Sequence, residues 1–203
     1  MATGQEHAPP RCIYPKGMDW PRKITVPSCA KHNNDFSEAD EYLRFLLGAI
    51  AKNVPEPIIS SAVRGAMRLA EKRSSNLRQF GFQWEGDFLN IGKRFRLRIE
   101  LLQTVLTKMA RALYFHHYNY QKKLLIPLGA LPLFIPPDSS PDPSFNATIE
   151  EFRKDTAKDM DIHPKFGGHQ DIFTYQVFES SDWVRVNMKF YGHHHAAVVG
   201  IFQ

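Results

Sequence analysis

Residues 183–190, WVRVNMKF, change the hydrophobic period of the chain. From Val184 onward apolar and polar side chains alternate, which is the pattern of a strand with one buried face. Further strand-like segments at 172–178 and 196–202 lie on either side, each separated from it by a short turn-like stretch. Because strands joined by short turns run antiparallel, the C-terminal end predicts an antiparallel sheet of about three strands.

Upstream of this sheet, apolar residues recur at helical spacing. Steps of three and four residues predict the clearest helix between about 96 and 117. Residues 37–51 predict a second helix, whose first turn is rich in acids, as a helix N-terminus favours. A basic helix is expected over 58–73 and a short, mostly charged one over 147–160. The fold class predicted from these elements is α+β.

Three other segments are less periodic. Residues 1–34 are dense in Pro, Cys, His and Asn and predict loops and short strands, with a strand at 24–26 that Pro27 closes. Residues 82–91 are expected to hold a short strand or two. Residues 127–143 contain six prolines and no usable period, which predicts an extended loop.

Composition places the chain among ordinary globular proteins. Of its 203 residues, 43% are hydrophobic and 23% are charged, and the net charge of +5 permits a polyanionic partner such as nucleic acid. Two cysteines, Cys12 and Cys29, are too few for a disulfide scaffold and favour a reducing, cytoplasmic compartment. The longest apolar stretch is short and broken by prolines, so no membrane partner is expected.

Candidate chemistry concentrates near the N-terminus. Glu6-His7 places an acid beside an imidazole, and the prolines that follow stiffen the chain. Cys29 and His32 have the C-x-x-H spacing of half a zinc site, and Asn33-Asn34 follows at once. Hydrolysis of a phosphodiester needs a base and a cation. His7 suits the base, and Glu6 with Asn33 offers the oxygen ligands that Mg²⁺ prefers.

The runs EHAPPRCIYPKG (6–17) and ITVPSCAKHNNDFSEADEYLRFLL (24–47) resemble the HNH endonuclease family, whose catalytic module is the ββα-metal fold. The resemblance implies an HNH-like module over 1–52 and an extension of unknown role over 53–203. It implies that Glu6 and His7 are the acid and the general base and that Asn33 ligates Mg²⁺ or Mn²⁺. Cys29 and His32 correspond to the second zinc knuckle. Within the extension, KMARALYFHH (108–117) and FYG (190–192) resemble extensions in the same branch.

The chain departs from this family in two places. Only five residues precede Glu6 and none is Cys or His, so the first zinc knuckle is missing and little bound zinc is expected. The Asn expected before ITVP is replaced by Pro21-Arg22-Lys23. Metal-dependent cleavage of nucleic acid, expected to be DNA, is therefore weighed against an alternative. The alternative is a catalytically degenerate HNH-fold protein that binds nucleic acid or another protein.

Each motif also has a plain structural interpretation. A single C-x-x-H motif is common by chance. An alternative interpretation is therefore that Cys29 is a buried thiol and His32 a surface imidazole, with no metal between them. Taken alone, His7 and Asn33 are typical of ordinary loop residues, whereas His7 taken together with residues 29–34 favours the catalytic role. A basic face on the helix over 58–73 is either solvated surface or a contact for a phosphate backbone; its residues are Arg64, Arg68, Lys72 and Arg73.

Two histidine runs are interpreted as structural. His116 and His117 end the predicted helix over 96–117, where the dipole favours a cation. His193-His194-His195 falls in a predicted turn, and three adjacent residues rarely ligate one ion because neighbours in a strand point to opposite faces.

Overall fold

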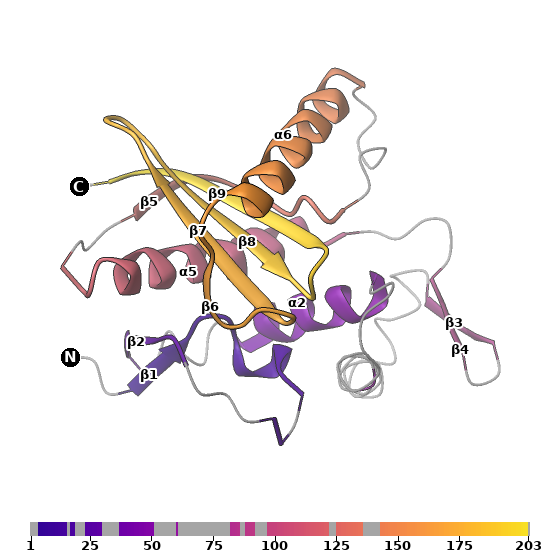
Figure 1. The fold of residues 1–203 in the computed structure, drawn as a ribbon. Coiled ribbons are helices and arrows are strands. Elements are labelled where there is room, and N and C mark those ends of the chain that lie inside the picture. The colour runs from indigo at the N-terminus through magenta and orange to yellow at the C-terminus, as the bar shows by residue number, and fades with distance from the viewer. Residues whose placement is uncertain are drawn as a thin grey trace.

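The fold was analysed in a computed structural model, shown in Figure 1. The structure describes residues 4–15, 17–18, 23–29, 37–50, 60, 82–85, 88–91, 97–121, 125–135 and 143–202. In these residues helices and antiparallel strands occur together, so the predicted α+β class is confirmed.

The largest element is a five-stranded antiparallel sheet at the C-terminal end, in the order β5-β9-β8-β7-β6. The three predicted strands are present and form its centre, whereas the two edge strands, β5 and β6, were not predicted. The strands are β5 (Leu125–Leu131), β6 (Phe166–His169), β7 (Phe173–Glu179), β8 (Val184–Phe190) and β9 (His194–Phe202).

The extended loop expected over 127–143 was wrong at both ends. β5 continues to Leu131, and a helix begins at Pro143. Pro127 is tolerated because β5 is an edge strand and its register shifts between Pro127 and Gly129. Pro143 suits the first turn of a helix, where no intrahelical partner for an N–H is needed.

Two long helices cover opposite faces of the sheet (Figure 1). Helix α5 (Ile99–His117) lies on the apolar face, where the side chains of Val186, Met188 and Val198 join its buried stripe in one core. Helix α6 (Pro143–Ile162) crosses the other face. The predicted helices over 96–117 and 147–160 are thus confirmed, the second of them longer than expected.

The N-terminal part begins with a hairpin followed by a helix. Strand β1 (Gly4–His7) pairs antiparallel with β2 (Thr25–Ser28), and the short 3-10 helix η1 (Arg11–Ile13) lies between them in the chain. Pro27 lies within β2 rather than closing it, since Pro27 pairs with Gln5. Helix α2 (Ser37–Ile50) follows, close to the bounds predicted for it.

The remaining predicted elements lie between α2 and α5. A second antiparallel hairpin, β3 (Phe82–Glu85) and β4 (Phe88–Ile91), confirms the strands expected at 82–91. The basic helix expected over 58–73 lies outside the described residues, apart from Ser60, which is helical.

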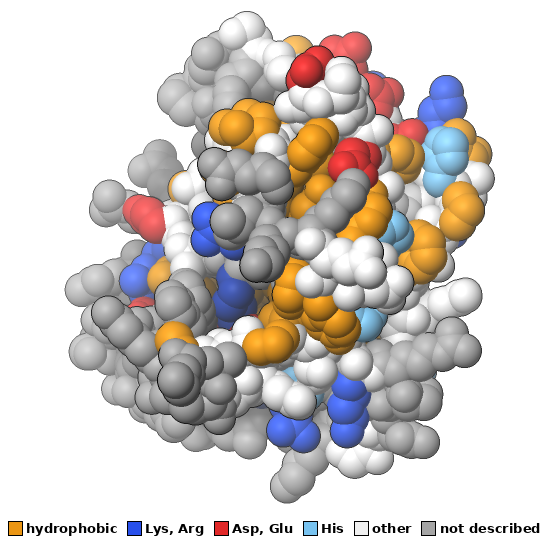
Figure 2. Space-filling model, turned by 90° about the vertical axis from the view of Figure 1, so that its left-hand side faces the viewer, with side chains coloured by type: hydrophobic (Ala, Val, Ile, Leu, Met, Phe, Trp, Pro, Cys, Tyr) orange, Lys and Arg blue, Asp and Glu red, His pale blue; other side chains and the backbone are white. Residues whose placement is uncertain are grey.

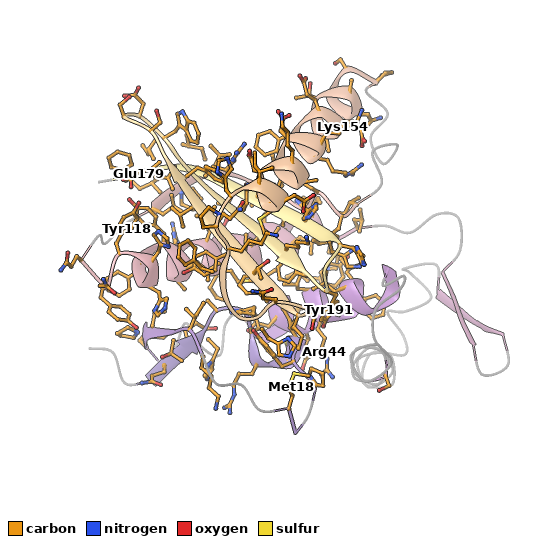
Figure 3. The ribbon with its side chains drawn as sticks, viewed as in Figure 1. Met18, Arg44, Tyr118, Lys154, Glu179 and Tyr191 are labelled. Atoms are coloured by element: carbon orange, nitrogen blue, oxygen red, sulfur yellow. The ribbon has the colours of Figure 1, made fainter. Side chains whose placement is uncertain are left out.

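One hydrophobic core joins the N-terminal part to the sheet. It contains Ile13 and Ile24 of the N-terminal segment, Leu43 of α2, Leu106 of α5 and Phe190 of β8. Tyr191, directly after β8, reaches the same segment, and its buried hydroxyl donates a hydrogen bond to the carbonyl oxygen of Ile13 at 2.8 Å (Figure 3). The division at residue 52 stays a prediction, although side chains from both parts share this core.

Hydrophobic side chains also gather on the side of the molecule seen in Figure 2. Large hydrophobic residues that remain exposed include Tyr120, Leu128, Ile201 and Phe202. In the described part of the chain, no helix is both long enough and apolar enough to cross a membrane.

Candidate functional site

Three of the predicted site residues are described: Glu6, His7 and Cys29. The other predicted residues lie outside the described part of the chain, so their positions stay predictions; they are His32, Asn33, Arg64, Arg68, Lys72 and Arg73.

The hairpin of β1 and β2 fixes where the described residues lie. His7 ends β1 opposite Thr25, the first residue of β2. The hairpin continues by one hydrogen bond, in which the backbone N–H of Ala8 donates to the carbonyl oxygen of Ile24 at 3.0 Å. Cys29 directly follows the last residue of β2, at the opposite end of the hairpin. Since a strand rises about 3.3 Å per residue, the backbones at His7 and Cys29 are separated by roughly 10 Å or more.

The environment of His7 favours the neutral imidazole. Burial lowers the pKa of His7, and the positive charges of Arg11 and Lys23 lower it further, while the nearby Glu6 carboxylate opposes them. Near pH 7 the ring is therefore neutral and able to accept a proton, which a general base requires.

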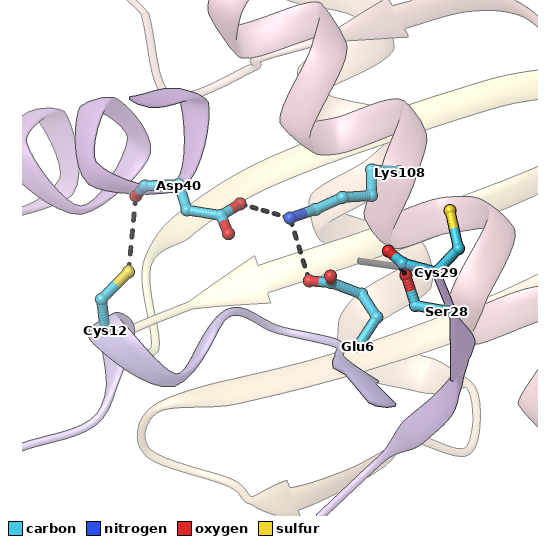
Figure 4. A network of polar contacts seen from close by, with 6 residues as sticks. All are labelled: Glu6, Cys12, Ser28, Cys29, Asp40 and Lys108. Carbon is cyan, nitrogen blue, oxygen red and sulfur yellow. Dashed lines mark hydrogen bonds and ion pairs between the residues drawn. The ribbon is translucent and has the colours of Figure 1, made fainter. Parts of the chain in front are cut away.

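Glu6 lies in a three-residue charge network that joins three elements (Figure 4). The Lys108 ammonium of α5 donates to Glu6 Oε1 at 3.0 Å and to Asp40 Oδ1 of α2 at 2.5 Å. All three side chains are largely buried: Lys108 is 9% exposed, Glu6 14% and Asp40 19%. Two carboxylates therefore share one ammonium in a largely buried place.

The network continues to Cys12 on the other side of Asp40. The Cys12 thiol donates to the backbone carbonyl oxygen of Asp40 at 3.5 Å. Burial, together with the Asp40 carboxylate, raises the pKa of Cys12 to about 12. Burial also raises the pKa of Asp40, and the Lys108 ammonium only partly offsets that effect. Cys12 is therefore a protonated thiol near pH 7.

The sequence alone did not identify Lys108. It explained the acidic residues in the first turn of α2, Asp40 among them, only as residues that a helix N-terminus favours. A local signal existed for Lys108, because Val105 and Ala112, three residues before it and four after it, are both buried. Helix α5 packs against the sheet on one side and against α2 on another, so a lysine between buried neighbours lies inside the molecule. No spacing rule, however, pairs a lysine with a carboxylate 102 residues away.

The C-terminal end of α5 lies beside Thr25, the residue that pairs with His7 across the hairpin. The Tyr120 hydroxyl donates to the carbonyl oxygen of Thr25 at 3.2 Å. Asn119 takes a left-handed conformation with φ of 51°. The N–H of Asn119 donates to the carbonyl oxygen of His116, and the N–H of Tyr120 donates to the carbonyl oxygen of Phe115. These two bonds form a Schellman motif, in which the Tyr120 and Phe115 rings also contact each other.

The predicted metal ligands were tested against this geometry. Across the ranges that the structure describes, no group of three His, Cys, Asp or Glu side chains is arranged to hold a metal ion. The Glu6 carboxylate has the oxygen chemistry that Mg²⁺ prefers, but it contacts the Lys108 ammonium. A divalent ion at Glu6 would have to share or displace that contact.

Comparison with known proteins gave no match: no family model, no curated protein and no solved structure matches the chain significantly. The HNH resemblance therefore stays a prediction from the motifs quoted above.

Proposed function

We propose that this protein is a metal-dependent endonuclease of the HNH type that hydrolyses phosphodiester bonds, with DNA as the expected substrate. One observation carries the proposal. The chain order of hairpin and helix, β1, β2 and α2, puts a neutral His7 at the end of the first strand. That is the element order which the HNH resemblance predicts for a general base.

In this proposal His7 accepts a proton from the attacking water, and its lowered pKa keeps the ring ready to do so. Glu6 and Asn33 would hold Mg²⁺ or Mn²⁺, which stabilises negative charge on the phosphate when bound. Lys108 keeps the Glu6 carboxylate in a fixed position. Cys29 lies at the far end of the hairpin, which suits a scaffolding role rather than a chemical one.

A second candidate is favoured by the Glu6–Lys108 contact. Lys108 already neutralises the one predicted metal-binding carboxylate that the structure describes. An HNH-fold protein that no longer cleaves, and instead binds nucleic acid or another protein, would tolerate such a contact without loss. The two candidates therefore differ in whether Glu6 exchanges its ammonium partner for a divalent ion.

Cleavage of supercoiled plasmid by the purified chain in Mg²⁺ or Mn²⁺ tests the proposal. We expect the wild-type chain to nick the plasmid and His7→Ala to lose about 10² to 10⁴ in rate, as loss of a general base typically costs. His169→Ala is the matched control, because that histidine belongs to β6 and not to the hairpin.

The result that overturns the proposal is cleavage by His7→Ala at the wild-type rate. Absence of cleavage by the wild-type chain, together with retained DNA binding in EDTA, would instead favour the non-catalytic candidate. Circular dichroism of each variant shows whether the fold is kept, so a loss of activity is not mistaken for unfolding.

A further inference from the structure

The layer between α6 and the sheet has an unusual composition. The described residues include four polar residues that are buried: Thr156, Thr174, Gln176 and Asn187. All four lie in this layer, whereas the layer on the α5 side is apolar. Buried apolar side chains such as Met160 and Ala197 are few here. The layer is therefore built differently from the core.

The sheet register shows which side chains share this face. Gln176 lies opposite Asn187, and Thr174 lies opposite Lys189, which in turn lies opposite His195. The Gln176 amide donates to the backbone carbonyls of Asp159 and His163, both at 2.9 Å, so this face is the one turned toward α6. Because directly opposed residues project to the same side, the whole set faces the helix.

Many polar atoms in this layer have no hydrogen-bond partner within the described residues. They are Asn187 Nδ2 and Oδ1, Thr156 Oγ1, Thr174 Oγ1, Gln176 Oε1, Arg185 Nε and His195 Nε2. A buried polar group without a partner costs about 1–3 kcal/mol relative to its hydrated state. Burial of these atoms therefore favours the docking of α6 less than burial of the same number of apolar atoms would.

Two carboxylates of α6 neutralise the two cations of the face. Asp159 forms an ion pair with Arg185, and Asp161 lies 3.7 Å from Lys189. The Arg185 guanidinium also lies over the Phe178 ring, 4.9 Å from its centroid. Beneath α6, then, the sheet offers cations, amides, hydroxyls and an aromatic ring, and the charged groups of β7, β8 and β9 that face α6 are both positive.

We propose that this face of β7, β8 and β9 is a binding surface for single-stranded nucleic acid and that α6 covers it in the state seen here. Cations contact phosphates, amides and hydroxyls contact base edges, and aromatic rings stack on bases. Asp159 and Asp161 occupy the places of two phosphates. Arg185 and Lys189 are four residues apart on β8, a span of about 13 Å, so a strand lying along β8 meets both.

The composition of α6 agrees with a displaceable cover. The helix carries five acidic and three basic residues, against a net charge of +5 for the chain. Of the α6 side chains that the structure describes, only Thr156 and Met160 are fully buried. When α6 leaves the sheet, its few apolar contacts are lost, but the unpartnered polar atoms become hydrated, and the cations become available to phosphate. This surface is independent of His7 and of any metal ion.

Binding of fluorescein-labelled (dT)12 to the full chain in EDTA tests the proposal, with fluorescence anisotropy as the readout. The Asp159→Asn/Asp161→Asn variant removes both α6 carboxylates that face the cations. The Glu151→Gln/Asp155→Asn variant is the matched control, because it changes the net charge equally on exposed positions of the same helix. Hydrogen exchange of α6 amides and circular dichroism are recorded for each variant.

We expect Asp159→Asn/Asp161→Asn to bind (dT)12 at least about fivefold more tightly than the control variant, the lower end of typical coupling between sites. Its α6 amides should also exchange faster. Adding Lys189→Gln should reverse most of the gain in affinity. Equal affinities of the two double variants, or no effect of Lys189→Gln, would overturn the proposal. Equal binding of a twelve-residue poly-glutamate peptide would overturn the assignment to nucleic acid.

Discussion

Lys108 on α5 and Glu6 on β1 are 102 residues apart in sequence, yet their side chains meet at 3.0 Å in a largely buried place. The same ammonium binds Asp40 of α2 at 2.5 Å. Lys108 is the first residue of the run KMARALYFHH, and Tyr191 is the central residue of FYG. Both residues contact the N-terminal part, Lys108 through Glu6 and Tyr191 through Ile13. These contacts explain why the two runs occur in the extension together with the N-terminal motifs.

The first prediction concerns the charge network. Lys108→Met removes the cation that the Glu6 and Asp40 carboxylates share, in surroundings that are largely buried. Breaking such a pair by removing one partner typically costs about 3–5 kcal/mol. We expect the free energy of unfolding, measured in urea, to fall by about 3 kcal/mol.

Lys158→Met is the control for this prediction, since Lys158 is exposed on α6. Adding Asp40→Asn to Lys108→Met should recover part of the loss, because it removes one of the two opposed charges. A loss no larger than that of Lys158→Met would show that the network contributes little to stability.

The second prediction concerns Tyr191. Tyr191→Phe keeps the ring but leaves the buried carbonyl of Ile13 without the 2.8 Å hydrogen bond that it accepts. An unsatisfied buried acceptor costs about 1–3 kcal/mol, and we expect a loss in that range in urea unfolding. Tyr120→Phe is the comparison, because that residue is 46% exposed and water replaces its bond to Thr25. Equal losses in the two variants would contradict this account.

Elements with a strong, uninterrupted period were predicted correctly from the sequence, as α5 and β8 show. β5 was missed because Pro127 and Gly129 interrupt its pattern at a register shift, which only an edge strand tolerates. β6, with the sequence FGGH, has too few apolar residues for any period. The local hydrophobic pattern therefore identified the elements whose own side chains determine their structure. It missed the strands that form because they pair with adjacent strands.

The alternation in β8 also predicted the wrong environment for one side chain. A strand with one buried face should turn Asn187 toward water, yet Asn187 is fully buried under α6. Periodicity reports the apolar face but not whether another element covers the polar one. The candidate site shows the same limit: Glu6 and His7 were located by motif, whereas Lys108 enters only through tertiary packing.

The third prediction concerns pH and the histidines of β9. Burial lowers the pKa of His194 and of His195 to about 4. His193 acts in the same direction on both rings and Lys189 does so on His195, where Asp161 opposes them. The folded state keeps both rings neutral, whereas in the unfolded chain they take up protons near pH 6.5. Their contribution to stability is thus complete above pH 6.5 and is lost as the pH falls toward 4.

Allowing for solvent screening of these partly exposed rings, we expect each to contribute about 1–2 kcal/mol to that loss. Urea unfolding between pH 7 and pH 4 measures it. His194→Gln/His195→Gln should flatten the pH dependence relative to the wild-type chain, while His193→Gln, at the exposed first position of the run, should not. A double variant with the wild-type slope would refute the assignment.

The last prediction returns to His7. The Arg11 charge is, after burial, the largest influence that lowers the pKa of this imidazole, so Arg11→Gln should raise that pKa. Proton NMR titration of the His7 ring, in EDTA, measures the shift without reference to activity. If His7 is the general base, cleavage requires its neutral form, and the acid limb of the pH–rate profile must move upward with the same shift. A raised NMR pKa with an unmoved acid limb would remove His7 from the reaction, while an unchanged NMR pKa would show that Arg11 does not act on this ring. Lys154→Gln on α6, far from β1 in the chain, removes the same charge and should leave both measurements unchanged.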